Sequence, residues 1–202
     1  MKVYLDSHAT TPLDPRVLKA MLPYLTSEFA NPSSAHVLGV RVRETVEQAR
    51  ATIAQFIHAQ PHQIYFTSGA TESNNTVIKG FVRISRPLYL TSSNIEHPSV
   101  LECLRSLARD WDRATFYTPN QVDRFGWLSD FATRFDFCSV HAANNELGNV
   151  YDLERLGRMC RSRGAFFHTD ATQAIGKTVI DVESQYIDAL SFSAHKLVGR
   201  TV

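Results

Sequence analysis

Several polar residues with chemical potential follow short apolar runs in this sequence. The small-residue turn "SGATESNN" comes after one such run and opens a helix, so Ala70 offers a backbone N–H and Thr71 a hydroxyl to an anion. Asp170 ends a later run, "GAFFHTD", and Lys196 follows the last one, "YIDALSFSAH". We interpret the turn as a phosphate-binding site, or phosphate seat, and the two charged residues as groups that lie at the ends of buried strands.

A phosphate seat, a strand-end aspartate and a strand-end lysine together match what pyridoxal phosphate requires of a protein. A lysine amine forms a Schiff base with the cofactor's aldehyde, and an acidic partner keeps the ring nitrogen protonated so that the ring takes up electrons. Lys196 and Asp170 fit those roles. Each feature alone has a simpler interpretation, because such turns are common, a strand-end Asp often caps a helix, and a lysine is usually a solvated surface charge.

The elements that must position these residues are short strands alternating with helices. The apolar runs lie at 63–68, 87–92, 114–118, 136–142, 164–170 and 186–195. They are apolar on both faces, which is typical of a covered sheet. Between them, apolar residues at three- and four-residue intervals predict helices, one of which ends at Gly164 as at a helix C-cap. The alternation predicts an α/β fold with a mostly parallel sheet, whose ligands gather at the carboxyl ends of the strands.

A long helix is predicted over 41–59, ahead of these runs and after a loop-rich segment at 27–39. Its apolar stripe consists of Val42, Val46, Ala49, Ile53 and Phe56. We find no internal repeat and no strong internal domain boundary, so a single domain is expected.

Composition excludes several classes of function. Lys plus Arg total 21 against 20 for Asp plus Glu in 202 residues, and the formal charge of +1 favours neither nucleic acid nor a membrane surface as partner. Three widely spaced cysteines argue against a disulfide framework or a metal site and favour a reducing cytoplasm. The N-terminus has no signal-like apolar region, and no stretch approaches the roughly 18 apolar residues of a membrane span.

Seven motifs in order resemble one family. They are "YLDSHATTPLDPRV", "NPSSAH", "FTSGATESNN", "EHPSV", "NNELG", "HTDATQAIGK" and "SFSAHK". Together they are similar to the cysteine desulfurases of the NifS/IscS type, which are pyridoxal-phosphate-dependent enzymes of the class V aminotransferase family. The resemblance runs from about residue 3 to Leu197. It implies the fold type I, aspartate aminotransferase-like large domain over residues 1–202, with an N-terminal arm over about 1–40.

The resemblance assigns a role to each candidate site residue. Lys196 would be the Schiff-base lysine, Asp170 would pair with the pyridine nitrogen, Gln173 with the phenolic oxygen, and His97 would stack on the ring; Lys196 and His97 are the catalytic candidates. The phosphate and pocket contacts would come from Ala70, Thr71, Asn145, Ser193 and His195. From the residues alone we prefer simpler interpretations: His97 begins a helix, His195 lies in the core and Gln173 caps a turn.

The family pattern fades at the end of the sequence. Relatives continue past the lysine with a Gly-Pro turn and about as many residues again, whereas Arg200 stands where they usually have Pro. The resemblance therefore implies that the large domain is incomplete here and that the small domain is absent. The resemblance implies that three features of relatives are absent as well: the loop cysteine that accepts sulfur, the arginine that binds the substrate carboxylate, and a phosphate contact across the dimer. We expect the chain to be inactive or incomplete alone. Cys103, Cys138 and Cys160 are not expected to replace the missing nucleophile.

The activity implied is conversion of L-cysteine to L-alanine with sulfur transfer to an enzyme thiol, in a homodimer that serves a sulfur-acceptor or scaffold protein, as in iron–sulfur cluster assembly. Two alternatives stay open. One is another class V reaction, such as transamination or selenocysteine lyase chemistry. The other is a non-catalytic fragment or interaction module that pairs with a full-length relative.

Overall fold

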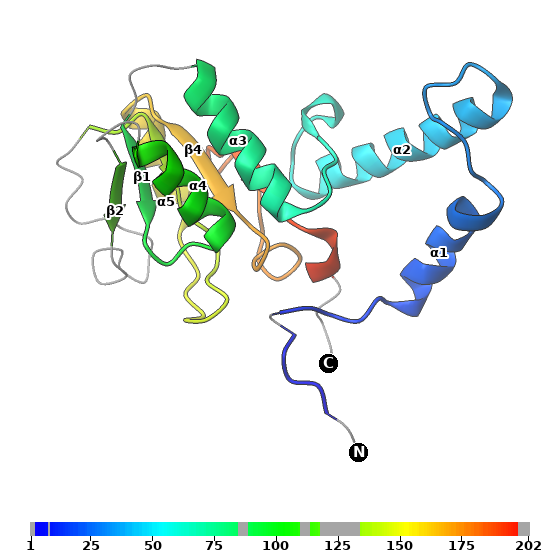
Figure 1. The fold of residues 1–202 in the computed structure, drawn as a ribbon, viewed down its shortest axis with the longest axis horizontal. Helices are drawn as coiled ribbons and strands as arrows, with labels where there is room; N and C mark the ends of the chain where they lie inside the picture. Colours follow the sequence, from blue (N-terminus) through cyan, green and yellow to red (C-terminus); the bar gives the residue numbers. More distant parts are fainter. Residues whose placement is uncertain (1–2, 8, 85–88, 110–113, 118–133, 198–202) are drawn as a thin grey trace. The chain divides into compact units, whose positions relative to one another are not determined.

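The computed structural model describes residues 3–7, 9–84, 89–109, 114–117 and 134–197 (Figure 1). They divide into two compact units, the first comprising the described residues up to Phe66 and the second those from Thr67 to Leu197. Among the described residues, no helix has the length and hydropathy needed to cross a membrane. The same residues contain no cluster of His, Cys, Asp or Glu side chains arranged to hold a metal ion.

The first unit contains α1 (Pro15–Thr26), α2 (Val37–Phe56) and a 3-10 turn η1 (Pro61–Gln63). Asp14 begins α1 by accepting a hydrogen bond from the Arg16 N–H at 2.7 Å, and Pro15 fits the first helical position. The predicted long helix is confirmed as α2, although it starts earlier, where His36 accepts from the Gly39 N–H at 3.2 Å. Helix α1 was not predicted, and none of its residues is buried.

The strand predicted at 63–68 is wrong. Residues after η1 have no regular structure, and although Ile64 is buried, Tyr65 and Phe66 are exposed. The Arg50 guanidinium of α2 donates to the Ile64 carbonyl and lies 5.0 Å from the centre of the Phe66 ring. The backbone group that a strand would use therefore bonds to a side chain of the preceding helix.

The second unit is built on a five-stranded parallel sheet with the order β2-β1-β3-β4-β5. Its strands are β1 (Leu90–Ser93), β2 (Ala114–Tyr117), β3 (Phe137–Ser139), β4 (Phe166–Asp170) and β5 (Ala189–Ser191). Its helices are α3 (Ala70–Ile84), α4 (Pro98–Arg109), α5 (Leu153–Ser162) and the 3-10 turn η2 (Ala194–Lys196). The predicted α/β class and parallel sheet are confirmed, with strands shorter than the apolar runs.

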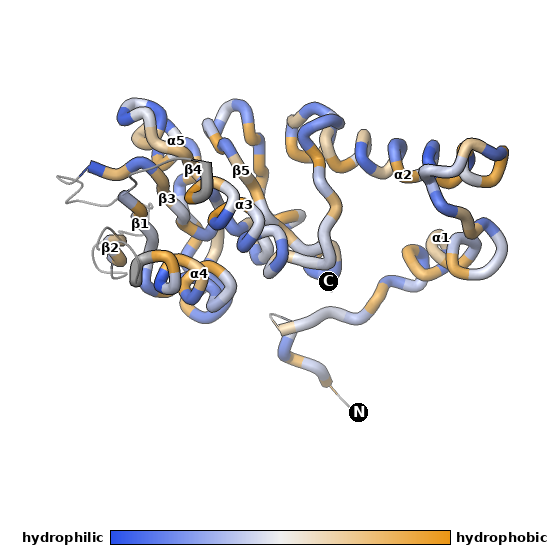
Figure 2. Tube along the Cα trace, turned by 45° about the horizontal axis from the view of Figure 1, so that its top comes forward, coloured by the Kyte–Doolittle hydropathy of each residue, from blue (hydrophilic) through white to orange (hydrophobic). Residues whose placement is uncertain are grey.

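Helices α3 and α4 pack on one face of the sheet, where Ile78 and Leu104 share a core with Phe137. Successive strand residues point to opposite faces, so Cys138 points to the other face, where it contacts Cys160 of α5. The cap predicted at Gly164 is confirmed: its φ is 66°, in the left-handed region, and its N–H donates to the Arg161 carbonyl at 3.1 Å. Figure 2 shows hydrophobic and hydrophilic positions interspersed along the helices, as this two-sided covering requires.

Candidate functional site

The candidate site residues lie in the second unit, and most of them follow the carboxyl ends of its strands. His97 follows β1, Asp170 is the last residue of β4, and Lys196 lies in η2 beyond β5. Because all strands are parallel, these ends share one edge of the sheet. The sequence-based prediction that the functional side chains meet at one edge is consistent with this topology.

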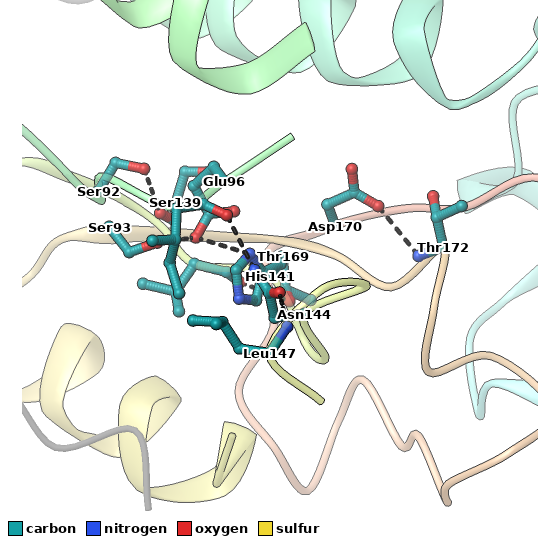
Figure 3. Close-up of polar contacts among 12 residues, drawn as sticks. Ser92, Ser93, Glu96, Ser139, His141, Asn144, Leu147, Thr169, Asp170 and Thr172 are labelled. Atoms are coloured by element: carbon teal, nitrogen blue, oxygen red, sulfur yellow. Dashed lines mark hydrogen bonds and ion pairs between the residues drawn. The ribbon is translucent and has the colours of Figure 1, made fainter. Parts of the chain in front are cut away.

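Asp170 is a buried carboxylate, only 6% exposed, held by two neutral donors. Its Oδ1 accepts from the Thr172 N–H at 2.9 Å, as Figure 3 shows, and its Oδ2 accepts from Asn74 Nδ2 at 2.8 Å. Within the described residues, no cationic side chain forms an ion pair with Asp170. A buried carboxylate without a countercharge is costly, so this site favours a cationic N–H donor as ligand.

His97 connects to Asp170 through two residues that the sequence analysis did not single out. Asn74 Nδ2, besides bonding Asp170, lies 2.9 Å from Ser99 Oγ, and Ser99 Oγ lies 2.8 Å from His97 Nδ1. The Ser99 backbone N–H also donates to His97 Nδ1, at 3.1 Å. The ring of His97 itself is exposed. The structure thus brings together the residues expected at the ring nitrogen and at the ring face.

Asn74 had a signal in the sequence. It lies four residues before Ile78 on α3, on the same face as the apolar residues that enter the core, and it is fully buried. A polar residue on an apolar helical stripe must find hydrogen-bond partners within the fold. Its Oδ1 is nevertheless buried without a partner among the described residues.

Lys196 is 5% exposed, far below the usual exposure of a lysine. Its backbone N–H donates to the Ser193 carbonyl at 3.1 Å, which closes the 3-10 turn and places Ser193 at its start. His195, within the turn, is exposed. The loop after Asp170 packs against this segment, since a Cβ added at Gly176 would lie 3.4 Å from Leu197 Cδ2.

Gln173 belongs to that loop, where its Oε1 accepts from Lys177 Nζ at 3.4 Å. Asn145 is half-buried in the turn after β3, which its neighbour Asn144 organises. Asn144 Oδ1 accepts from the Leu147 N–H at 2.7 Å, and its Nδ2 donates to the Ile95 carbonyl at 3.0 Å. Asn144 therefore supports this turn, while Asn145 keeps its role as a prediction.

The first turn of α3 contains the remaining candidates. Ala70 is the first helical residue and is half-buried, and Thr71 beside it is exposed. The first N–H groups of a helix have no intrahelical partner and favour negative charge. The Ser68 N–H donates to the Glu72 carboxylate at 2.6 Å, and this bond lowers the pKa of Glu72. Ser68 precedes the helix, so this bond does not use the N–H groups of Ala70 and Thr71.

A buried pair, Glu96 and His141, supports the loop that carries His97. His141 Nδ1 donates to Glu96 Oε1 at 3.1 Å, and the Ser93 hydroxyl donates to the same oxygen. Both residues are buried at the ends of neighbouring strands (Figure 3). No role was predicted for His141, because an acidic residue paired with a histidine 45 positions away has no local signature.

His168, on the same face of β4 as Asp170, is a second buried histidine. It bonds to Ser139 Oγ at 2.8 Å through Nδ1 and to Ser191 Oγ at 3.1 Å through Nε2. Burial lowers the pKa of His168 to about 4, against the opposing effect of the Asp170 carboxylate. His168 is therefore neutral near pH ~7 and supplies Asp170 with no countercharge.

The comparisons with known proteins are consistent with this site. The model of the aminotransferase class-V family matches residues 3–201. The chain belongs to the class V aminotransferase family. Enzymes of this family and the cysteine desulfurases within it depend on pyridoxal phosphate.

Among curated relatives of this class V chain, the cysteine desulfurase IscS of Methylobacillus flagellatus is 42% identical over 208 residues, covering 98% of this chain and 50% of that protein. The cysteine desulfurase of Mus musculus is 44% identical over 204 residues, covering 98% and 44%. A solved structure described as "SspA in complex with cysteine" has a TM-score of 0.86 and 37% identity, covering 96% of this chain and 57% of that one. The chain spans about half the length of the curated relatives it matches.

The residues present fit pyridoxal phosphate. Among the residues that the structure describes, the buried Asp170 carboxylate has no cationic donor, and the protonated ring nitrogen of the cofactor is one. The first turn of α3 suits a phosphate. A buried lysine follows β5, the strand next to the one that ends in Asp170. The individual contacts of the site residues with the cofactor stay predictions.

Proposed function

We propose that this chain is the cofactor-binding part of a pyridoxal-phosphate-dependent enzyme of the cysteine desulfurase type, with L-cysteine as substrate. The observation that carries the proposal is the buried Asp170 carboxylate, which the described residues hold with neutral donors and which is connected by hydrogen bonds to His97. Its relatives named cysteine desulfurase and the neighbour solved with cysteine support the substrate.

Pyridoxal phosphate, when bound, supplies an aldehyde that reacts with amines and a cationic ring that withdraws electrons. Lys196 would hold the cofactor through its amine and would move a proton at the substrate's α-carbon. Asp170 accepts the hydrogen bond of the ring nitrogen and keeps that nitrogen protonated. His97 would bind the ring of the cofactor and exclude water from it.

The other predicted residues bind and orient. Thr71 and the backbone N–H of Ala70 bind the phosphate at the start of α3, where the helix dipole adds to their hydrogen bonds. Ser193 and His195 bind it from the η2 side. Gln173 orients the phenolic oxygen of the ring. Asn145 lines the pocket beside the substrate.

We also propose that the sulfur-accepting thiol is none of the three cysteines of this chain. Cys103, Cys138 and Cys160 are all buried. Burial raises the pKa of Cys103, and the hydrogen bond with Cys160 together with burial raises the pKa of Cys138. Neither thiol is a ready thiolate, which sulfur transfer needs. In this proposal a homodimer in a reducing cytoplasm passes its sulfur to a further acceptor protein.

Borohydride reduction of the chain mixed with pyridoxal phosphate, followed by peptide mass mapping, tests the proposal. We expect one pyridoxyl adduct, at Lys196, and its loss in Lys196→Ala. Lys177, exposed on the loop after Asp170, provides a matched control, because Lys177→Ala should leave the adduct unchanged. A folded chain that carries no adduct at Lys196, or one that labels Lys177 equally, would refute it.

A further inference from the structure

Hydrogen-bond chemistry fixes the direction of every bond in the network between Asp170 and His97. An ionised carboxylate only accepts, so the atom of Asn74 that faces Asp170 at 2.8 Å is the NH₂ group. The same nitrogen is 2.9 Å from Ser99 Oγ, so its second hydrogen points to that hydroxyl. Asn74 therefore donates in both directions, and the orientation of its amide is not arbitrary.

The direction continues to the imidazole. Ser99 Oγ accepts from Asn74, which leaves its own hydrogen for His97 Nδ1 at 2.8 Å. The Ser99 backbone N–H, which can only donate, reaches the same Nδ1 at 3.1 Å. His97 Nδ1 is thus an acceptor of two hydrogen bonds, and the ring carries its proton on Nε2.

We propose that Asn74 is a positioning residue for the cofactor. One hydrogen of its amide holds the Asp170 carboxylate, and the other holds the Ser99 hydroxyl, which in turn holds the His97 ring. The inference rests on the proposed function, because Asp170 and His97 are the groups expected at the ring nitrogen and the ring face. In this inference one residue of α3, in the second turn of the helix, supports two residues from other elements. Asp170 comes from β4 and His97 from the loop after β1.

The chain contains a matched control in the neighbouring residue. Asn75 Nδ2 also donates two hydrogen bonds, to the Thr71 carbonyl at 2.9 Å and to the Ser99 carbonyl at 3.3 Å. Its acceptors are backbone oxygens, and neither Asp170 nor the Ser99 hydroxyl is among them. Asn75→Leu removes as many side-chain hydrogen bonds from the same helix as Asn74→Leu. It loses a contact with the Ser99 carbonyl but leaves the bonds among Asp170, Asn74, Ser99 Oγ and His97 Nδ1 in place.

The first measurement needs no cofactor and follows the ring nitrogens of His97 by ¹⁵N NMR, with His97→Gln to assign the signals. In the unaltered chain we expect the Nε2–H tautomer. Asn74→Leu should shift the Nδ1 resonance, because it removes the donor that directs the Ser99 hydroxyl hydrogen toward Nδ1, and Asn75→Leu should not. An Nδ1 resonance that is unchanged in Asn74→Leu overturns the inference, whatever the chain binds.

The second measurement compares affinities for pyridoxal phosphate and for an analogue whose ring nitrogen is replaced by carbon. A hydrogen bond to a charged group is typically worth a factor of about 10 to 100 in binding, and Asn74→Leu should weaken the natural cofactor by that factor. The analogue does not need Asp170, so its affinity should change less than about threefold. Equal weakening of both compounds would mean that Asn74 only maintains the fold, which overturns the inference.

Failure of the proposed function looks different. If the unaltered chain binds no pyridoxal phosphate, that proposal is refuted, while the NMR comparison still decides whether Asn74 orients His97. Should Asn74→Leu not fold, Ser99→Ala removes a single hydroxyl and leaves the Asn74 to Asp170 bond in place. It should shift the Nδ1 resonance of His97 and preserve the preference for the natural cofactor over the analogue; an unshifted resonance overturns the inference.

Discussion

The buried His168 should make the stability of this protein sensitive to acid. Its imidazole is fully buried between Ser139 and Ser191, and burial lowers its pKa from 6.5 to about 4. In the unfolded chain the ring regains its ordinary pKa. Between these two values the unfolded state binds one proton more than the folded state, so the free energy of unfolding falls as the pH falls. The contribution of His168 is fully present above pH ~6.5 and is lost as the pH approaches ~4.

The size of the effect follows from the difference between the two pKa values. Each pH unit is worth about 1.4 kcal/mol, so the full loss is about 3 kcal/mol, of which about 2 kcal/mol is already lost at pH ~5. A small domain has only about 5 to 15 kcal/mol of stability, so one histidine removes a large share of it.

Urea denaturation at several pH values, on the chain and on His168→Gln, measures this contribution. Glutamine keeps a donor and an acceptor for the two serines but does not titrate. We expect the variant to be less stable at pH ~8 and to lose about 2 kcal/mol less than the unaltered chain on going to pH ~5. Other groups titrate in this range, but they are common to both proteins. Equal losses in the two proteins would refute the assignment of a depressed pKa to His168.

Three further outcomes are expected. His141→Ala should lower the free energy of unfolding by about 3 kcal/mol in chemical denaturation, because it leaves the buried Glu96 carboxylate without its imidazole donor; a loss under about 1 kcal/mol would contradict this. The chain should associate at micromolar concentration in light scattering, because α1 exposes Leu18, Met21, Leu22 and Leu25, whereas a stable monomer would speak against it. With pyridoxal phosphate bound, alanine formation from cysteine should be slower than in a full-length relative by several orders of magnitude, since Cys103, Cys138 and Cys160 are buried; turnover within about tenfold of the relative would show that one of the three cysteines accepts sulfur.

The sheet was predictable from sequence because its strands are covered on both faces. Runs such as 164–170 begin with consecutive apolar residues because helices pack on either side, and that pattern is visible without an alignment. The run at 63–68 also contains consecutive apolar residues, but these lie in the first unit, where the Arg50 guanidinium of α2 donates to the Ile64 carbonyl. Composition alone does not say whether a neighbouring strand is available, so this prediction was wrong.

The site was predictable to the extent that its residues end strands. Asp170 and Lys196 are charged residues placed directly after apolar runs, and that position is informative by itself. Asn74 and Ser99 were missed because their importance lies in contacts between α3 and α4, 25 positions apart in sequence. Glu96 and His141 were missed for the same reason. Pairings across helices and strands depend on packing angles that local patterns do not encode.

The same face of the sheet changes its chemistry from one end of the strands to the other. Phe137 and Phe166 stack with ring centres 5.9 Å apart near the start of β3 and β4, and they belong to the core under α3 and α4. One step further along the strands, His168 and its two serines form a polar but neutral layer. Only at the carboxyl edge does a charge appear, at Asp170, where its partners within the described residues are again neutral. A protonated His168 would compensate the negative charge of Asp170, but burial lowers the pKa of His168 and keeps its ring neutral. Because the pKa of His168 is depressed and no described residue forms an ion pair with Asp170, the charge of Asp170 stays available for a ligand at the carboxyl ends of the strands.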